Sequence, residues 1–102
     1  MTFAVIFKPL AQLEIDEAYG WYQQEHIRMG HSFLDQLERT SNFLKDNPHL
    51  YPKVQDDLHR ANLNQFPYSL FYVVDGNIVN VLSCFHHHRD PKHWPKIAVS
   101  VD

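Results

Sequence analysis

The feature that most constrains this chain is an apolar run that ends in a cluster of polar side chains. Residues 78–85 read IVNVLSCF, mostly aliphatic, β-branched or aromatic, with no charge. Such a run is typical of a strand buried at or near the centre of a sheet. Residues 86–89 read HHHR, and Asp90-Pro91 then ends the strand because proline has no N–H for the ladder. The sequence therefore predicts a rigid strand that holds titratable and cationic groups at a surface.

The N-terminal part predicts a short strand followed by a helix. Residues 2–8 favour the strand, and Pro9 ends it. Helical periodicity then runs from Leu10 to about Ile27. We expect Glu14 and the neighbouring acidic residues to form a solvated face. The predicted core stripe of this helix consists of Ala11, Ile15, Ala18 and Tyr22.

A second helix is predicted after a turn at Met29-Gly30-His31, with Ser32 as its N-cap. Asp46-Asn47-Pro48 ends it. Because the turn is short, the two helices should pack antiparallel as a hairpin. The predicted core face of the second helix consists of Phe33, Leu37, Thr40 and Leu44.

The remaining chain predicts a three-stranded antiparallel meander. A loop over residues 48–57 precedes strands at 58–63, 68–74 and 78–85, and Asp75-Gly76-Asn77 indicates a tight hairpin between the last two. The strand at 68–74 is apolar on both faces. The helical hairpin should cover one face, and the C-terminal segment or a partner protein should cover the other. The fold class is therefore α+β.

Bulk composition indicates one globular domain spanning residues 1–102. The net charge of −3 disfavours a protein whose main role is to coat nucleic acid. The single cysteine, Cys84, lies in the apolar strand and should be a small buried hydrophobe. We expect a cytoplasmic protein with no membrane association, because no apolar stretch is long enough for a signal peptide or a span.

Three passages together resemble the RelE/ParE superfamily: residues 32–52, residues 59–86 and HHHRDPKHW at 86–94. The superfamily comprises the toxins of prokaryotic type II toxin–antitoxin modules, often described as plasmid stabilisation proteins. The ordered residues that carry the resemblance are Asn47-Pro48, Arg60, Phe66-Pro67-Tyr68, Tyr72, Asp75-Gly76, His86, Arg89-Asp90-Pro91 and Trp94. The resemblance implies a β-α-α-β-β-β toxin that forms a hetero-oligomer with a cognate antitoxin.

The superfamily divides by mechanism, and the chain favours the ParE-like branch. The RelE-like branch cleaves mRNA on the ribosome, for which Arg60, His86 and Arg89 are the candidate catalytic residues here. That branch usually also carries several lysines or a glutamate and a C-terminal tyrosine or histidine, whereas no tyrosine follows Tyr72 and the lysine-rich strand is missing. The ParE-like branch inhibits DNA gyrase and needs no catalytic triad. A third alternative is a non-toxic member that only binds antitoxin.

The C-terminal cluster has several interpretations. Arg60, His87, His88, Arg89 and Trp94 are candidates for contact with the target or the antitoxin. If the last strand reaches the histidines, His86 should share a face with Leu82 and Cys84, and either His86 or His87 could simply bind a neighbouring loop.

Other functions of the cluster have weaker support. A metal site of His86 and His88 with His93 or Asp90 has no CxxC or HExxH spacing behind it, and we expect no metal or other cofactor. The two tryptophans, Trp21 and Trp94, are expected in the core or in a lid.

Overall fold

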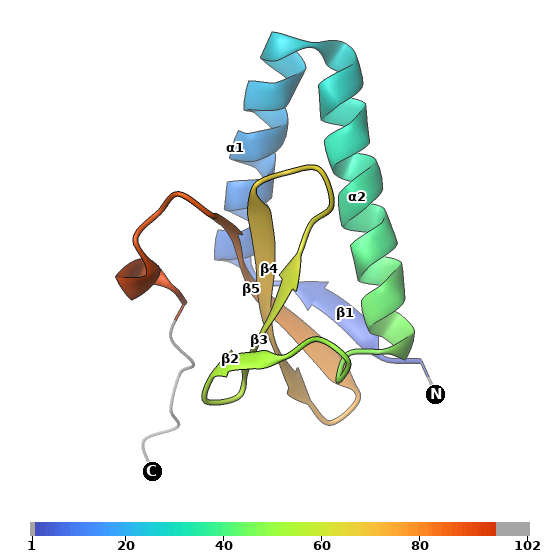
Figure 1. Cartoon of the computed structure of the whole chain (residues 1–102). Coiled ribbons are helices and arrows are strands. Elements are labelled where there is room, and N and C mark those ends of the chain that lie inside the picture. Colours follow the sequence, from blue (N-terminus) through green and yellow to red (C-terminus); the bar gives the residue numbers. More distant parts are fainter. Residues whose placement is uncertain (1, 96–102) are drawn as a thin grey trace.

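A computed structural model of the chain describes residues 2–95. It consists of a five-stranded sheet with a helical hairpin on one face (Figure 1). Its elements are β1 (Ala4–Phe7), α1 (Pro9–Glu25), α2 (Ile27–Asp46), β2 (Lys53–Gln55), β3 (Leu58–Asn62), β4 (Tyr68–Asp75), β5 (Ile78–His86) and the 3₁₀ turn η1 (Pro91–His93). No helix in the described part of the chain is long and apolar enough to cross a membrane.

The sheet has the strand order β1-β5-β4-β3-β2. The last strand in sequence, β5, therefore lies inside the sheet. It pairs in parallel with β1, where Phe7 is opposite Val81, and antiparallel with β4. The prediction of a buried strand that carries polar groups at its end is confirmed. Strand β2 was missed, because three exposed residues next to prolines carry no apolar alternation.

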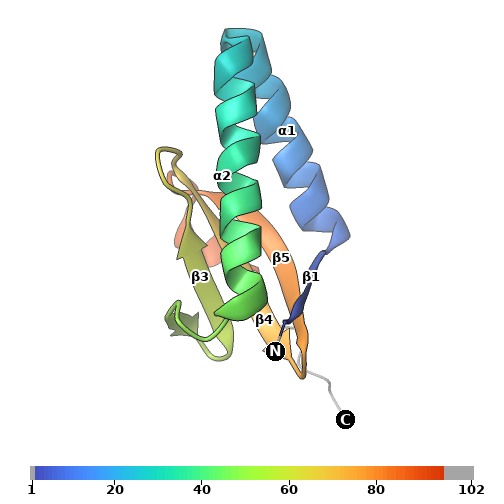
Figure 2. The same cartoon turned by 90° about the vertical axis from the view of Figure 1, so that its right-hand side faces the viewer.

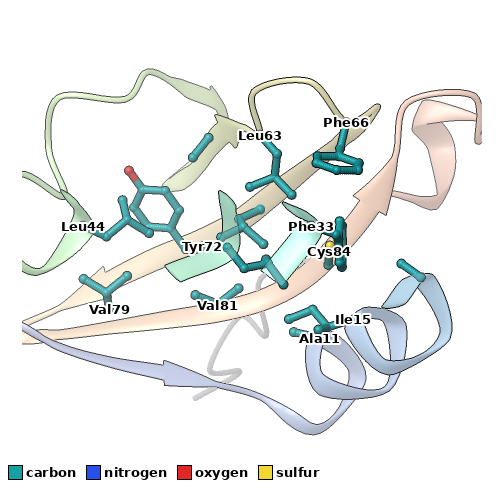
Figure 3. Close-up of a cluster of buried hydrophobic side chains, with 14 of the residues drawn as sticks. Ala11, Ile15, Phe33, Leu44, Leu63, Phe66, Tyr72, Val79, Val81 and Cys84 are labelled. Carbon is teal, nitrogen blue, oxygen red and sulfur yellow. The ribbon is translucent and has the colours of Figure 1, made fainter. Parts of the chain in front are cut away.

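The helical hairpin packs across one face of the sheet and extends beyond its edge (Figure 2). Both predicted core stripes are buried. With residues of β3 to β5 they form the main core (Figure 3), which includes the fully buried Phe33, Tyr72 and Val81. The Tyr72 hydroxyl donates to the carbonyl of Pro48 over 2.7 Å and so ties the end of α2 to the sheet.

The predicted turn at Met29-Gly30-His31 is wrong, as is the N-cap at Ser32. The chain reverses at His26, whose backbone is extended and whose Nδ1 accepts the N–H of Arg28 over 3.1 Å. Gly30 lies inside α2, where a Cβ would be 3.2 Å from the Tyr19 ring and 3.3 Å from the Gln23 Cα. This glycine therefore permits close helix packing and does not form the turn.

A β-bulge in β5 changes which side chains face the helices. Phe71 is opposite Ser83 and Tyr72 is opposite Val81, so Leu82 is the extra residue. Val81 and Cys84 both face the helix-side core, whereas Leu82 packs on the opposite face. The expectation that Leu82 shares a face with Cys84 and His86 is therefore wrong for Leu82.

The face of the sheet away from the helices has a smaller core. Leu58, Phe71 and Phe85 are buried there, and Trp94 covers Phe71 with 5.1 Å between ring centroids. Trp94 follows η1, so the C-terminal segment covers this face, as one of the two predicted alternatives requires. Trp21, by contrast, is 57% exposed on α1, and its assignment to the core is wrong.

Candidate functional site at the end of β5

Glu14 connects α1 to the end of β5. Strand β1 ends at Phe7, so beyond Val81 the outer edge of β5 has no neighbouring strand. Glu14 supplies the missing acceptor: its Oε1 accepts the backbone N–H of Cys84 over 3.1 Å and the Ser83 hydroxyl over 2.6 Å. Its side chain is only 13% exposed. The expectation of a solvated acidic face is therefore wrong for Glu14.

Arg89 completes this junction. Its Nη1 donates to Glu14 Oε2 over 3.0 Å, and its guanidinium lies 4.6 Å from the centre of the Phe85 ring. The side chain is half exposed, so the ion pair itself stabilises the fold only modestly. The contact nevertheless fixes the polar segment after β5 and neutralises much of the Arg89 charge.

Arg60 belongs to a second network, on the face away from the helices. Its Nε donates to Ser69 Oγ and to Asn62 Oδ1, each over 3.1 Å. Ser69 Oγ donates to Asn62 and lies 2.8 Å from His87 Nε2. Because the serine proton is used on Asn62, His87 must donate from Nε2, which leaves its Nδ1 as an acceptor.

The Arg60 guanidinium is also packed between rings. It lies 5.7 Å from the Trp94 ring centre and 5.9 Å from that of Phe71. These contacts and the serine bond hold the guanidinium in one orientation, which suits recognition of a phosphate or carboxylate.

His86 points to a different neighbourhood. Its ring meets Tyr68 edge-on with 4.8 Å between centroids, and its Nδ1 accepts the backbone N–H of His88 over 3.0 Å. Partial burial lowers the pKa of His86, and the nearby His88 lowers it further. Partial burial also lowers the pKa of His87, followed by the charges of Arg60 and His86. Both imidazoles are therefore neutral at pH 7.

The candidate residues do not form one cluster. Arg60, His87 and Trp94 come together on the face away from the helices, and His86 lies on the helix side. Arg89 lies at the edge of β5, bonded to Glu14 and packed on Phe85. Within residues 2–95, no hydrogen bond or ring contact joins Arg60 to His86 or Arg89. Asp90 caps η1 by accepting the N–H of Lys92 over 3.0 Å. No group of three metal-ligating side chains gathers anywhere in the described residues.

Sequence reasoning missed three members of the site. Glu14 joins residues 69 to 75 positions later in the chain, a separation at which no local pattern carries information. Ser69 and Asn62 lie in strands whose residue pattern indicated only which side chains are buried. The strand register is the signal that could have identified them, because Asn62 pairs with Ser69 across β3 and β4 and Arg60 lies two residues away.

A small α+β protein with a helical hairpin on one face of the sheet and a polar cluster at the end of an inner strand fits the RelE/ParE superfamily. The sequence model described as ParE toxin of type II toxin-antitoxin system, parDE, matches residues 5–91, and the chain belongs to this family. The predicted superfamily is confirmed.

Solved structures show the same fold. The chromosomal ParDE toxin–antitoxin system from P. aeruginosa contains a chain that is 12% identical, with a TM-score of 0.71 over 83% of this chain and 96% of that one. The YoeB dimer from Staphylococcus aureus is 22% identical, with a TM-score of 0.55 over 86% and 100% of the two chains. The YoeB-YefM complex from the same organism contains a chain that is 20% identical, with a TM-score of 0.54 over 86% of this chain and 100% of that one. No curated protein matches the sequence.

Proposed function

We propose that this chain is a growth-inhibiting toxin that binds DNA gyrase, is neutralised by a cognate antitoxin, and catalyses no reaction of its own. The observation that carries the proposal is the separation of Arg60 and His87 from His86 and Arg89. RNA cleavage needs a base, a charge that stabilises the phosphorane and an acid around one phosphate. Here Arg89 forms an ion pair with Glu14, and Arg60 is linked to His87 only through Ser69.

The protonation states support the same conclusion. Both histidines have lowered pKa values, which favours the neutral imidazole and disfavours either ring as the acid for a leaving 5′-oxygen. A rigid guanidinium next to Trp94 is instead a good contact group, because arginine and tryptophan dominate binding energy at protein interfaces. We assign the target-contact surface to Arg60, His87, His88, Arg89 and Trp94.

The first test is inhibition of supercoiling by purified gyrase. The protein should block supercoiling, and Arg60→Ala should raise the concentration required by roughly tenfold because a central interface arginine is removed. Arg39→Ala on the exposed side of α2 is the matched control and should change nothing. Full supercoiling in the presence of a preparation that still arrests growth would contradict the gyrase target.

A ribosome-dependent ribonuclease is the second candidate, and one observation favours it. His87 and the fixed Arg60 guanidinium both bond to Ser69, so an imidazole and a cation lie on one face. If this pair cleaved RNA, cell-free translation would yield new mRNA ends within the translated frame, and primer extension would map them. His87→Asn and Arg60→Ala would each then reduce cleavage by orders of magnitude. We expect intact mRNA.

A further inference from the structure

A groove on the helix side of β5 shares Arg89 with the target-contact surface, and its other lining residues lie outside that surface. Its first compartment is a cavity of about 260 Å³ whose walls include Glu14, Glu17, Trp21, Tyr68, His86 and Arg89. A second cavity of about 490 Å³ shares Trp21, Tyr68 and His86 with the first and continues towards Met29 and Phe66. The two compartments form one open groove, which we call the Trp21 groove.

Charge in the first compartment is negative. Two carboxylates line it, and the single arginine is already bound to Glu14. Glu17 is exposed and forms no ion pair within residues 2–95. The lowered pKa of His86 keeps this ring neutral, and burial first of all raises the pKa of Tyr68 to about 12, so its phenol is neutral as well. The compartment therefore attracts a cation.

Its walls are aromatic. Trp21 is 57% exposed, an unusual state for an indole that contacts only Tyr22 edge-on among the aromatic residues of the described chain. An exposed indole ring and a partly buried phenol ring beside carboxylates favour guanidinium and ammonium groups, through cation–π attraction and charge-assisted hydrogen bonds. A cavity below the usual size of a drug site suits one long side chain better than a whole metabolite.

We propose that the Trp21 groove binds an arginine or lysine side chain of the antitoxin, whose neighbouring residues lie in the second, more apolar compartment. Charge complementarity selects this occupant: a basic side chain meets Glu17 and two ring faces, while an apolar segment meets Met29 and Phe66. The inference rests on the antitoxin partnership of the proposed function and is independent of the gyrase target.

The first experiment uses a minimal probe and nuclear magnetic resonance of the whole chain. N-acetyl-arginine amide should shift the Trp21 indole signal at millimolar concentration and leave the Trp94 indole unchanged. N-acetyl-citrulline amide has nearly the same shape without the charge and should produce no saturating shift. Equal shifts with both amides, or none with either, would overturn the proposal.

Two neighbouring carboxylates on α1 provide a matched pair of variants. Glu17→Gln removes a charge that lines the groove, and Asp16→Asn removes an equal charge that is hydrogen-bonded to Gln12 outside it. Glu17→Gln should weaken arginine amide binding roughly tenfold, the value of one partly desolvated charged hydrogen bond. Asp16→Asn should change it less than twofold. Equal effects would mean that only net charge is recognised.

The second experiment uses the cognate antitoxin. Glu17→Gln and Trp21→Ala should each weaken the complex at least tenfold, while growth arrest without antitoxin stays at the wild-type level. Substituting one arginine or lysine of the antitoxin by alanine should weaken the complex with the wild-type protein but not the complex with Glu17→Gln. That antitoxin residue is then the side chain bound in the groove. If no basic residue couples to Glu17, the proposal is wrong. A failure of the gyrase proposal would appear separately, as uninhibited supercoiling by the wild type.

Discussion

At the scale of single residues, the Glu14 side chain replaces the hydrogen bond that a neighbouring strand would give to the end of β5. It gives β5 a hydrogen-bond acceptor where β1 has ended and holds Arg89 with its other oxygen. Glu14→Ala leaves the Cys84 N–H without its partner in a poorly solvated place. The free energy of unfolding should fall by about 2 kcal/mol, measured by urea denaturation. Glu17→Ala, one turn along the same helix, should change it by less than about 0.5 kcal/mol.

Cys84 gives a second prediction at this scale. The side chain is 1% exposed, and burial, with a smaller effect of Glu14, raises the pKa of its thiol to about 12. Only the thiolate reacts with disulfide reagents. The thiol of the native protein at pH 8 should therefore not react with Ellman's reagent for hours. In 6 M guanidinium, where the protein is unfolded, it should react at once. Fast reaction of the folded protein would show that the end of β5 opens readily.

At the scale of elements, two glycines of the helical hairpin should respond in opposite directions. A Cβ at Gly20 would meet nothing within 4 Å, so Gly20→Ala should stabilise α1 by about 0.5–1 kcal/mol. A side chain at Gly30 would press on Tyr19 and on the backbone of Gln23, so Gly30→Val should cost about 1–3 kcal/mol. Thermal unfolding of both variants measures the difference. A destabilised Gly20→Ala would indicate a strained α1.

The error at the hairpin turn has a physical origin. A glycine between two helical patterns predicts a turn when only local sequence is considered. Here the absence of a side chain at Gly30 serves packing against α1, and His26 forms the reversal with its own ring as cap. The periodic stripes from Ala11 to Tyr22 and from Phe33 to Leu44 were predictable because burial repeats with the helix. The exact turn was not, because it depends on the partner helix.

At the scale of the whole molecule, stability should depend on pH through two histidines. The pKa values of His86 and His87 are lower in the folded protein than the ordinary 6.5. As the pH falls below about 6.5, the unfolded chain therefore takes up protons first, and the free energy of unfolding decreases.

The matching measurement is urea unfolding at pH 7.5 and pH 5.5. The decrease between the two should be smaller in the double variant His86→Asn, His87→Asn than in the wild type. His31→Asn, on the exposed side of α2, is the control and should keep the wild-type decrease. An unchanged pH dependence in the double variant would show that other groups cause it.

The sequence predicted the order of elements better than it predicted the site. Local alternation reports burial, so β5 and the polar residues after it could be found. The grouping of those residues depends on a one-residue bulge at Leu82, on the register that joins Asn62 to Ser69, and on a helix carboxylate near the other end of the chain. None of these is encoded within a window of a few residues. The nuclease hypothesis placed His86 with Arg60, whereas the fold places His87 there.

The parallel pairing of β1 with β5 also governs when the protein acquires its fold during synthesis. Residues 4–7 have no strand to pair with until residues 78–81 have been made. Glu14 likewise waits for Ser83, Cys84 and Arg89. Contacts of such long sequence separation form late, because the chain must close a large loop before they gain any energy. A ribosome-bound chain that stops before β5 therefore lacks the strand that pairs with β1 and the polar surface at the end of that strand.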